Sequence, residues 1–129
     1  MDPNIIIRPS ILPVRQTIDK LETFLRQQGV TIYARIDQQA EAAKAGITLQ
    51  SLEFLLFGNP QKGGSLMAAE PMAALDLPLK VIAWEDSHKK VYVAYNQADY
   101  IGSRYHLSKD LSKLIDIDPV IAKVLSTEV

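Results

Sequence analysis

Residues 57–65, with the sequence FGNPQKGGS, have the spacing of a phosphate-binding loop but lack its lysine. From Gly58 the pattern reads G-x-x-x-x-G-G-S, whereas nucleotide-binding loops read G-x-x-x-x-G-K followed by Ser or Thr, and their lysine contacts the phosphates. Gly64 occupies the lysine position here. The sequence therefore argues against a nucleotide triphosphatase. It leaves open a structural turn between a strand and a helix, or a loop that binds an anion or another small ligand.

The same segment supplies most of the candidate binding residues. We expect a loop at 58–64, a helix that opens at Ser65, and free backbone amides beside Gly63 and Gly64, where glycine permits positive φ. Other polar or unusual side chains fall at the ends of predicted strands. The candidate ligand-binding residues are Asp37, Asn59, Gly63, Gly64, Ser65, Met67, Glu85 and Tyr95.

Each candidate also has an ordinary structural explanation. Asp37 is well placed to cap a short helix, and Asn59 precedes a proline and is a common turn former. Glu85 and Asp86 are neighbours on a predicted strand, so their side chains point to opposite faces and do not form a catalytic pair. An enzyme is an alternative only if Asp37, Glu85 and Tyr95 surround one pocket.

Several other chemistries have little support in the composition. The 129 residues include no cysteine, and His88 and His106 have no partners at metal-ligand spacing, so we expect neither a metal site nor a cofactor. The net charge is −1, with both signs scattered along the chain, which disfavours a nucleic-acid partner. No stretch approaches the about 20 apolar residues that cross a bilayer, and no signal peptide is evident. We therefore expect no membrane partner and a cytoplasmic location.

The elements that must position these residues alternate between strands and helices. Predicted strands cover about 4–12, 30–37, 49–58, 79–85 and 90–95, and predicted helices cover 13–28, 38–45, 65 onward with a restart at Pro71, 97–107, 107–114 and a last helix from Asp118. In 30–37, apolar and polar residues alternate, which predicts that Ile32, Ala34 and Ile36 share one buried face. The turn sequence DSHK predicts an antiparallel hairpin between the last two strands.

This order favours the α+β class in a single domain, residues 1–129. We expect about five strands in a mainly antiparallel sheet, with helices packed on one face. The two final helices follow the hairpin and one further helix, and the sequence does not say whether they cap the core or meet a partner.

A series of short motifs within residues 34–96 resembles the domain of unknown function 302 family. The motifs are R-I-D at 35–37, F-G-N-P at 57–60, G-S-L-M at 64–67, D-L-P-L-K at 76–80, W-E-D at 84–86 and Y-N at 95–96. The resemblance covers about residues 10–107 and implies a TATA-binding-protein-like α+β fold that often forms homodimers, with extra helices at 108–129. It implies no established activity. The family usually has histidine after the R-I-D aspartate, and this chain has Gln38, whose amide does not titrate near neutral pH.

Three functions follow from these observations. The leading hypothesis is a small, soluble, homodimeric module that binds a small-molecule ligand or a partner at residues 58–67. The second is a specialised enzyme that uses Asp37, Glu85 and Tyr95. The third is a pure protein-interaction module that makes its contact through the final helices or an open sheet edge.

Overall fold

The computed structural model describes residues 2–126 and contains a five-stranded sheet in which all neighbouring strands are antiparallel. The strand order is β1-β5-β4-β3-β2. The strands are β1 (Ile5–Ser10), β2 (Thr31–Asp37), β3 (Leu52–Gly58), β4 (Leu79–Glu85) and β5 (Val91–Asn96). The predicted α+β class and five-stranded antiparallel sheet are confirmed. Met1 and residues 127–129 of the predicted domain lie outside the described residues.

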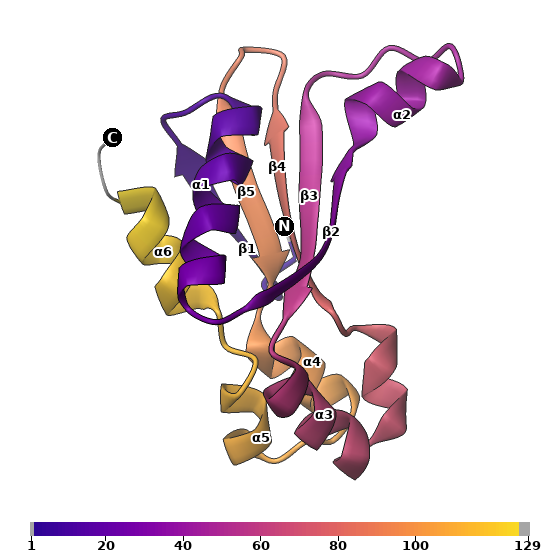
Figure 1. Ribbon diagram of the computed structural model, residues 1–129, viewed down its shortest axis with the longest axis vertical. Helices are drawn as coiled ribbons and strands as arrows, with labels where there is room; N and C mark the ends of the chain where they lie inside the picture. Colours follow the sequence, from indigo (N-terminus) through magenta and orange to yellow (C-terminus); the bar gives the residue numbers. More distant parts are fainter. Residues whose placement is uncertain (1, 127–129) are drawn as a thin grey trace.

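The helices form three groups around this sheet (Figure 1). The long helix α1 (Val14–Gln27) and the last helix α6 (Asp118–Ser126) lie against one face. A second group lies beyond the end of the sheet where β3 finishes and β4 starts. It contains α3 (Pro60–Ala69), the 3-10 helix η1 (Pro71–Leu75), α4 (Ala98–Arg104) and α5 (Lys109–Lys113). At the opposite end, α2 (Gln38–Lys44) projects from the body and buries no side chain.

The main core forms between α1 and the sheet, as the helical spacing of the α1 sequence predicts. Ile18 and Leu21 have no exposed surface, and they belong to one buried cluster with the strand residues Leu55 and Val93. Burying an aliphatic side chain of this size contributes roughly 1.5–3 kcal/mol. The helix ends before Gly29, whose φ of 78° lies in the left-handed region that favours glycine.

A bulge in β2 changes which of its side chains face α1. Ile32 pairs with Phe57 and Ala34 pairs with Leu56, so Tyr33 is an extra residue between two paired positions. Side chains alternate along a regular strand, so the extra residue leaves Ile32 on the helix-covered face and Ala34 on the opposite face. The prediction that the even-numbered apolar residues of this strand share one face is therefore wrong.

Downstream of the bulge, Arg35 lies on the helix-covered face and meets a buried carboxylate. Its Nη2 lies 3.0 Å from Oε1 of Glu53, and its Nη1 lies 2.6 Å from Asp19 and 3.2 Å from Glu22. Burial alone would lower the pKa of Arg35, but its hydrogen bonds to Asp19 and Glu53 outweigh burial and raise the pKa. Glu53 is only 6% exposed, so this ion pair is part of the interior.

The face of the sheet opposite to α1 and α6 is almost free of charge, and we call it the open face. Strand pairing and side-chain alternation place three rows of residues on it. The rows are Leu52, Trp84, Tyr92 and Pro9; then Ile36, Phe54, Ile82, Ala94 and Ile7; then Ala34, Leu56, Lys80, Asn96 and Ile5. Lys80 is the one charged residue in these rows, and its ammonium lies 4.5 Å from the centre of the Phe54 ring.

A second, smaller core holds the helices beyond the end of the sheet together. Leu66, Ile101 and Tyr105 are buried in it. Gly102 on α4 packs so closely against Ser112 on α5 that a Cβ atom at Gly102 would lie 2.1 Å from the Ser112 hydroxyl oxygen. This contact sets the distance between α4 and α5.

Candidate functional site

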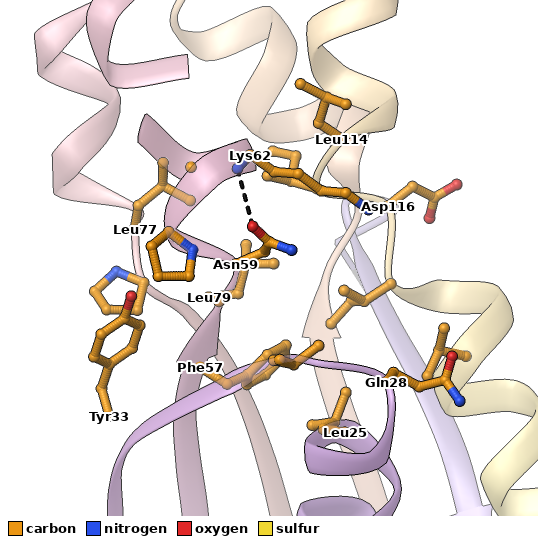
Figure 2. A pocket seen from close by; sticks show the side chains of 18 of the residues that line it. Leu25, Gln28, Tyr33, Phe57, Asn59, Lys62, Leu77, Leu79, Leu114 and Asp116 are labelled. Carbon is orange, nitrogen blue, oxygen red and sulfur yellow. Dashed lines mark hydrogen bonds between the residues drawn. The ribbon is translucent and has the colours of Figure 1, made fainter. Parts of the chain in front are cut away.

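A cavity of about 420 Å³ opens where the ends of α1 and β3 meet α3 and the connection between α5 and α6 (Figure 2). Its walls are mostly apolar. The apolar lining side chains are Leu25, Val30, Phe57, Met67, Leu77, Leu79, Leu114, Ile115, Ile117 and Val120. The volume falls within the about 300–1,000 Å³ typical of small-molecule sites. Leu25 and Phe57 are each 1% exposed and also belong to the main core, so the core forms part of the cavity wall.

Polar side chains in the cavity lining are few. They are Gln28, Tyr33, Asn59, Lys62, Lys113 and Asp116. Gln28, Lys62, Lys113 and Asp116 are exposed, and Asn59 is half-buried. An apolar interior with a small number of polar groups is the usual composition of a site that binds and orients a small molecule.

Asn59 determines where α3 begins. Its side-chain Oδ1 accepts hydrogen bonds from the backbone N–H groups of Gln61 (3.0 Å) and Lys62 (3.1 Å). Its backbone carbonyl accepts a third from the N–H of Gly63 at 2.8 Å. Pro60, at the first helical position, has no N–H to satisfy. All the donors of the first helical turn are therefore occupied within the chain.

This geometry corrects the interpretation of the glycine-rich segment. The predicted loop at 58–64 is instead the start of α3, which begins at Pro60 and not at Ser65. Gly63 and Gly64 do not have positive φ, and the expected free amides beside them are absent from the first turn. The Ser65 hydroxyl donates to the Gln61 carbonyl one turn earlier at 3.0 Å. An anion site made from backbone amides is therefore excluded here.

The structure brings only part of the predicted site together. Asn59, Gly63 and Met67 line the cavity, whereas Gly64 and Ser65 do not. Gly64 lies on α3, and outside the backbone of α3 and its two chain neighbours no described atom lies within 4 Å of where a Cβ would be.

Asp37, Glu85 and Tyr95 lie in three separate places. Asp37 caps α2 by accepting a hydrogen bond from the Ala40 N–H at 3.0 Å, which confirms the predicted cap. Glu85 pairs with Val91 near the hairpin turn and lines a different, shallower hollow. Tyr95 lies four residues beyond Val91, about 13 Å along β5. The three side chains share no cavity, so the enzyme alternative lacks the convergence that it requires.

Tyr95 has a structural role between the sheet and α6. Its hydroxyl donates to the Asp118 carboxylate at the start of α6. Arg8 on β1 donates from Nε to the Tyr95 hydroxyl at 2.9 Å and from Nη2 to Asp118 at 2.8 Å. Burial raises the pKa of the Tyr95 hydroxyl, and the hydrogen bond to Asp118 raises it further. Burial would raise the pKa of Asp118, but hydrogen bonds from Tyr95 and Arg8 lower it, which keeps the carboxylate ionised.

One wall of the cavity was not identified from the sequence. Residues 113–117, which connect α5 to α6, lie about fifty positions from α3 in the chain, and no local motif marks them as partners. The nearest signal is the pair Ile115 and Ile117 between two short helices. Tyr33 was also missed, because it reaches the cavity from the β2 bulge.

Comparison with known proteins identifies a family and a fold. The model of the family described as "Domain of unknown function DUF302" matches residues 6–126. This range extends beyond residues 10–107 at both ends and includes α5 and α6. A crystal structure of the uncharacterized conserved protein DUF302 from Bacillus stearothermophilus superimposes with a TM-score of 0.81 at 16% sequence identity. The match covers 96% of this chain and 97% of that chain.

Longer relatives carry a similar region. The fluoride-specific ion channel FluC 1 of Brucella suis biovar 1 (strain 1330) is 33% identical over 107 residues, which cover 83% of this chain and 42% of the relative. The protein with the same name from Brucella abortus biovar 1 (strain 9-941) is 33% identical over 107 residues, 40% of its length. This chain spans about two fifths of the curated relatives that it matches. Within residues 2–126, no helix has both the length and the apolar character required to cross a membrane.

Proposed function

The chain belongs to the DUF302 family, and from this premise we propose that it is a ligand-binding module whose site is the cavity between α3 and the α5–α6 connection. The observation that carries the proposal is the composition of this cavity. A cavity of about 420 Å³ has mostly apolar walls and a few polar side chains, as in small-molecule sites generally.

An apolar side chain at the edge of the cavity supports the same proposal. Leu114, the residue that follows α5, lines the cavity and is 36% exposed. A bound molecule with an apolar body would cover this surface, and covering apolar surface contributes about 25 cal/mol per Å². Three of the predicted site residues, Asn59, Gly63 and Met67, belong to the proposed site as parts of the cavity wall and not as an anion-binding loop.

Filling the cavity tests the proposal directly. We expect the neutral fluorophore N-phenyl-1-naphthylamine to bind the wild-type protein at one saturable site, with increased emission. Leu114→Trp is expected to weaken this binding by at least tenfold, because the indole would occupy the ligand's space. Leu49→Trp is the matched control, since Leu49 is also 36% exposed and lies between α2 and β3. No saturable binding by the wild type, or equal losses in both variants, would contradict the proposal.

The name of the Brucella relatives belongs to proteins about twice as long as this chain. The mostly apolar lining of the cavity does not suit fluoride as its ligand. Fluoride is a small, strongly hydrated anion, and transferring it to a mostly apolar cavity would cost its hydration without replacing it.

We further propose that the module is a homodimer in which two copies of the open face pack together. Ile5 and Ile7 on this face are 40% and 38% exposed, and neighbouring rows are also apolar. Contiguous apolar surface of this kind is typical of interaction sites. A second copy suits the face because Lys80 is its one charged residue, so pairing buries little charge.

The size of the open face supports a second copy as its partner. Five strands about 4.8 Å apart, each of six or seven residues at about 3.3 Å per residue, give a face of roughly 20 by 24 Å. This plane is about 500 Å², and projecting side chains make the accessible area larger. A standard interface buries about 800 Å² from each partner. The open face therefore supplies most of the required area.

A charge placed on the open face should prevent this association. We expect the wild type to sediment as a dimer at high micromolar concentration and Ile7→Glu to sediment as a monomer. Ile11→Glu is the matched control, because Ile11 is 76% exposed and follows β1 instead of lying on the open face. A monomeric wild type at all concentrations, or dissociation by Ile11→Glu as well, would contradict the homodimer.

A further inference from the structure

We infer that the cavity takes an amphiphilic anion, with an apolar body inside and a carboxylate or similar head group held at the rim by Asn59 and Lys62. This inference rests on the proposed ligand-binding function and specifies the class of ligand. It differs from the anion loop excluded above, because side chains would hold the head group in place of backbone amides.

Asn59 offers the cavity a donor and not an acceptor. Its Oδ1 already accepts from the backbone N–H groups of Gln61 and Lys62. This arrangement fixes the orientation of the amide, so the Nδ2 group points away from the helix (Figure 2). Within residues 2–126, the hydrogen bonds of Asn59 do not use Nδ2. A ligand atom beside Asn59 must therefore accept a hydrogen bond.

The charges near the cavity also favour a ligand with an anionic head group. Lys62 and Lys113 line the site with one carboxylate, Asp116, so two positive charges and one negative charge leave a net charge of +1. The ion pairs formed within the described part of the chain do not include Lys62 or Lys113. In Figure 2 the Lys62 side chain extends along the edge of the cavity towards Asp116. An anionic head group here would gain charge-assisted hydrogen bonds.

The interior favours an apolar body attached to that head group. Phe57, Leu79 and Ile117 line the cavity; Phe57 belongs to the main core, and Leu79 and Ile117 pack against it. A cationic head group would face two ammonium groups at the rim. A neutral alcohol would gain one hydrogen bond from Asn59 but no ion pairing. The anionic amphiphile is therefore the class that satisfies both parts of the site.

Three probes with alkyl chains of similar length and different head groups test this inference. They are octanoate, 1-octanol and octyltrimethylammonium, each competing with N-phenyl-1-naphthylamine. We expect octanoate to bind at least tenfold more tightly than 1-octanol, and the quaternary ammonium to bind more weakly than either. Equal affinity of octanoate and 1-octanol, or no displacement by any of them, would overturn the inference while the fluorophore still reports a ligand site. Failure of the fluorophore itself to bind would instead overturn the proposed function.

Two variants identify the residues that hold the head group. Asn59→Asp keeps the cap of α3, because a carboxylate oxygen accepts the same two N–H groups, but it replaces the Nδ2 donor with an acceptor. Lys62→Met keeps the aliphatic stem and removes the charge. We expect both variants to bind octanoate at least tenfold more weakly, and Lys62→Met to bind 1-octanol with unchanged affinity. Lys109→Met, an exposed substitution outside the cavity, is the control. Unchanged octanoate affinity in both variants, with unchanged unfolding temperatures, would overturn the assignment.

Discussion

Replacing Arg35 with methionine is expected to lower the free energy of unfolding by about 3–5 kcal/mol. Arg35 donates from Nε to Oε1 of Glu53 at 3.1 Å and approaches the same oxygen with Nη2 at 3.0 Å. Glu53 is 6% exposed, so the substitution would leave a buried carboxylate without its main partner. Arg15 lies 3.9 Å from the other oxygen of Glu53 and is mostly exposed, so it would compensate only partly. Urea unfolding with an unchanged m-value would measure the loss.

A surface arginine on α1, Arg26, provides the control for this prediction. Arg26 pairs with Glu22 one turn away at 3.0 Å, but its side chain is 57% exposed. Exposed pairs of this type contribute about 0.2–1 kcal/mol, so Arg26→Met should change stability little. The double variant Arg35→Met with Glu53→Met should recover much of the stability, because it removes the buried charge together with its partner. Equal effects of Arg35→Met and Arg26→Met would contradict the structural importance of the Arg35–Glu53 pair.

Gly102→Ala is expected to destabilise the protein by about 1–3 kcal/mol, as overpacking of a buried contact usually does. A Cβ at this position would lie 2.1 Å from the Ser112 hydroxyl oxygen and 3.1 Å from its Cβ. The hydroxyl is not free to move away, because it donates to the Ser108 carbonyl at 3.0 Å and Ser112 is 7% exposed. Relief of the clash therefore requires α4 and α5 to separate.

The same substitution at Gly64 should have the opposite effect. Gly64 lies within α3, and apart from its chain neighbours and the backbone of α3 itself no described atom lies within 4 Å of the position of its Cβ. Alanine is favoured over glycine in a helix interior by roughly 0.5–1 kcal/mol, so Gly64→Ala should stabilise the protein. Thermal unfolding of both variants would measure the two signs in one experiment. A stabilising Gly102→Ala would show that α4 and α5 do not pack as closely as described.

Elements with strong local patterns were predictable from the sequence. The apolar spacing of 14–25 and the glycine after it specify α1 and its end, and the turn DSHK specifies the hairpin between β4 and β5. In that turn, Asp86 Oδ1 accepts from the N–H groups of His88 and Lys90. These features depend on residues close in the chain, so periodicity and turn chemistry describe them well.

The candidate site was only partly predictable, for two physical reasons. At the start of α3, the adjacent glycines Gly63 and Gly64 suggested a loop. The cap from Asn59 and the proline that follows it outweighed the low helix propensity of these glycines. The second reason is distance along the chain. The wall formed by residues 113–117 meets α3 only in the folded protein, and no pattern within either segment specifies the other.

The extra residue in β2, Tyr33, makes the wall of the cavity independent of the orientation of the residues that follow in the strand. In a regular strand the two would be linked. Tyr33 reaches the cavity, whereas Arg35, two positions later, must meet Glu53 on the helix-covered face. In a regular strand, loss of one residue reverses the orientation of every side chain that follows. In β2, Ile32 and Ala34 already pair with two consecutive residues of β3, Phe57 and Leu56. A chain without Tyr33 would therefore keep Ala34 and the residues after it on their present faces of the sheet. Residue 33 at the cavity can therefore change or be lost while the Arg35–Glu53 ion pair stays in place.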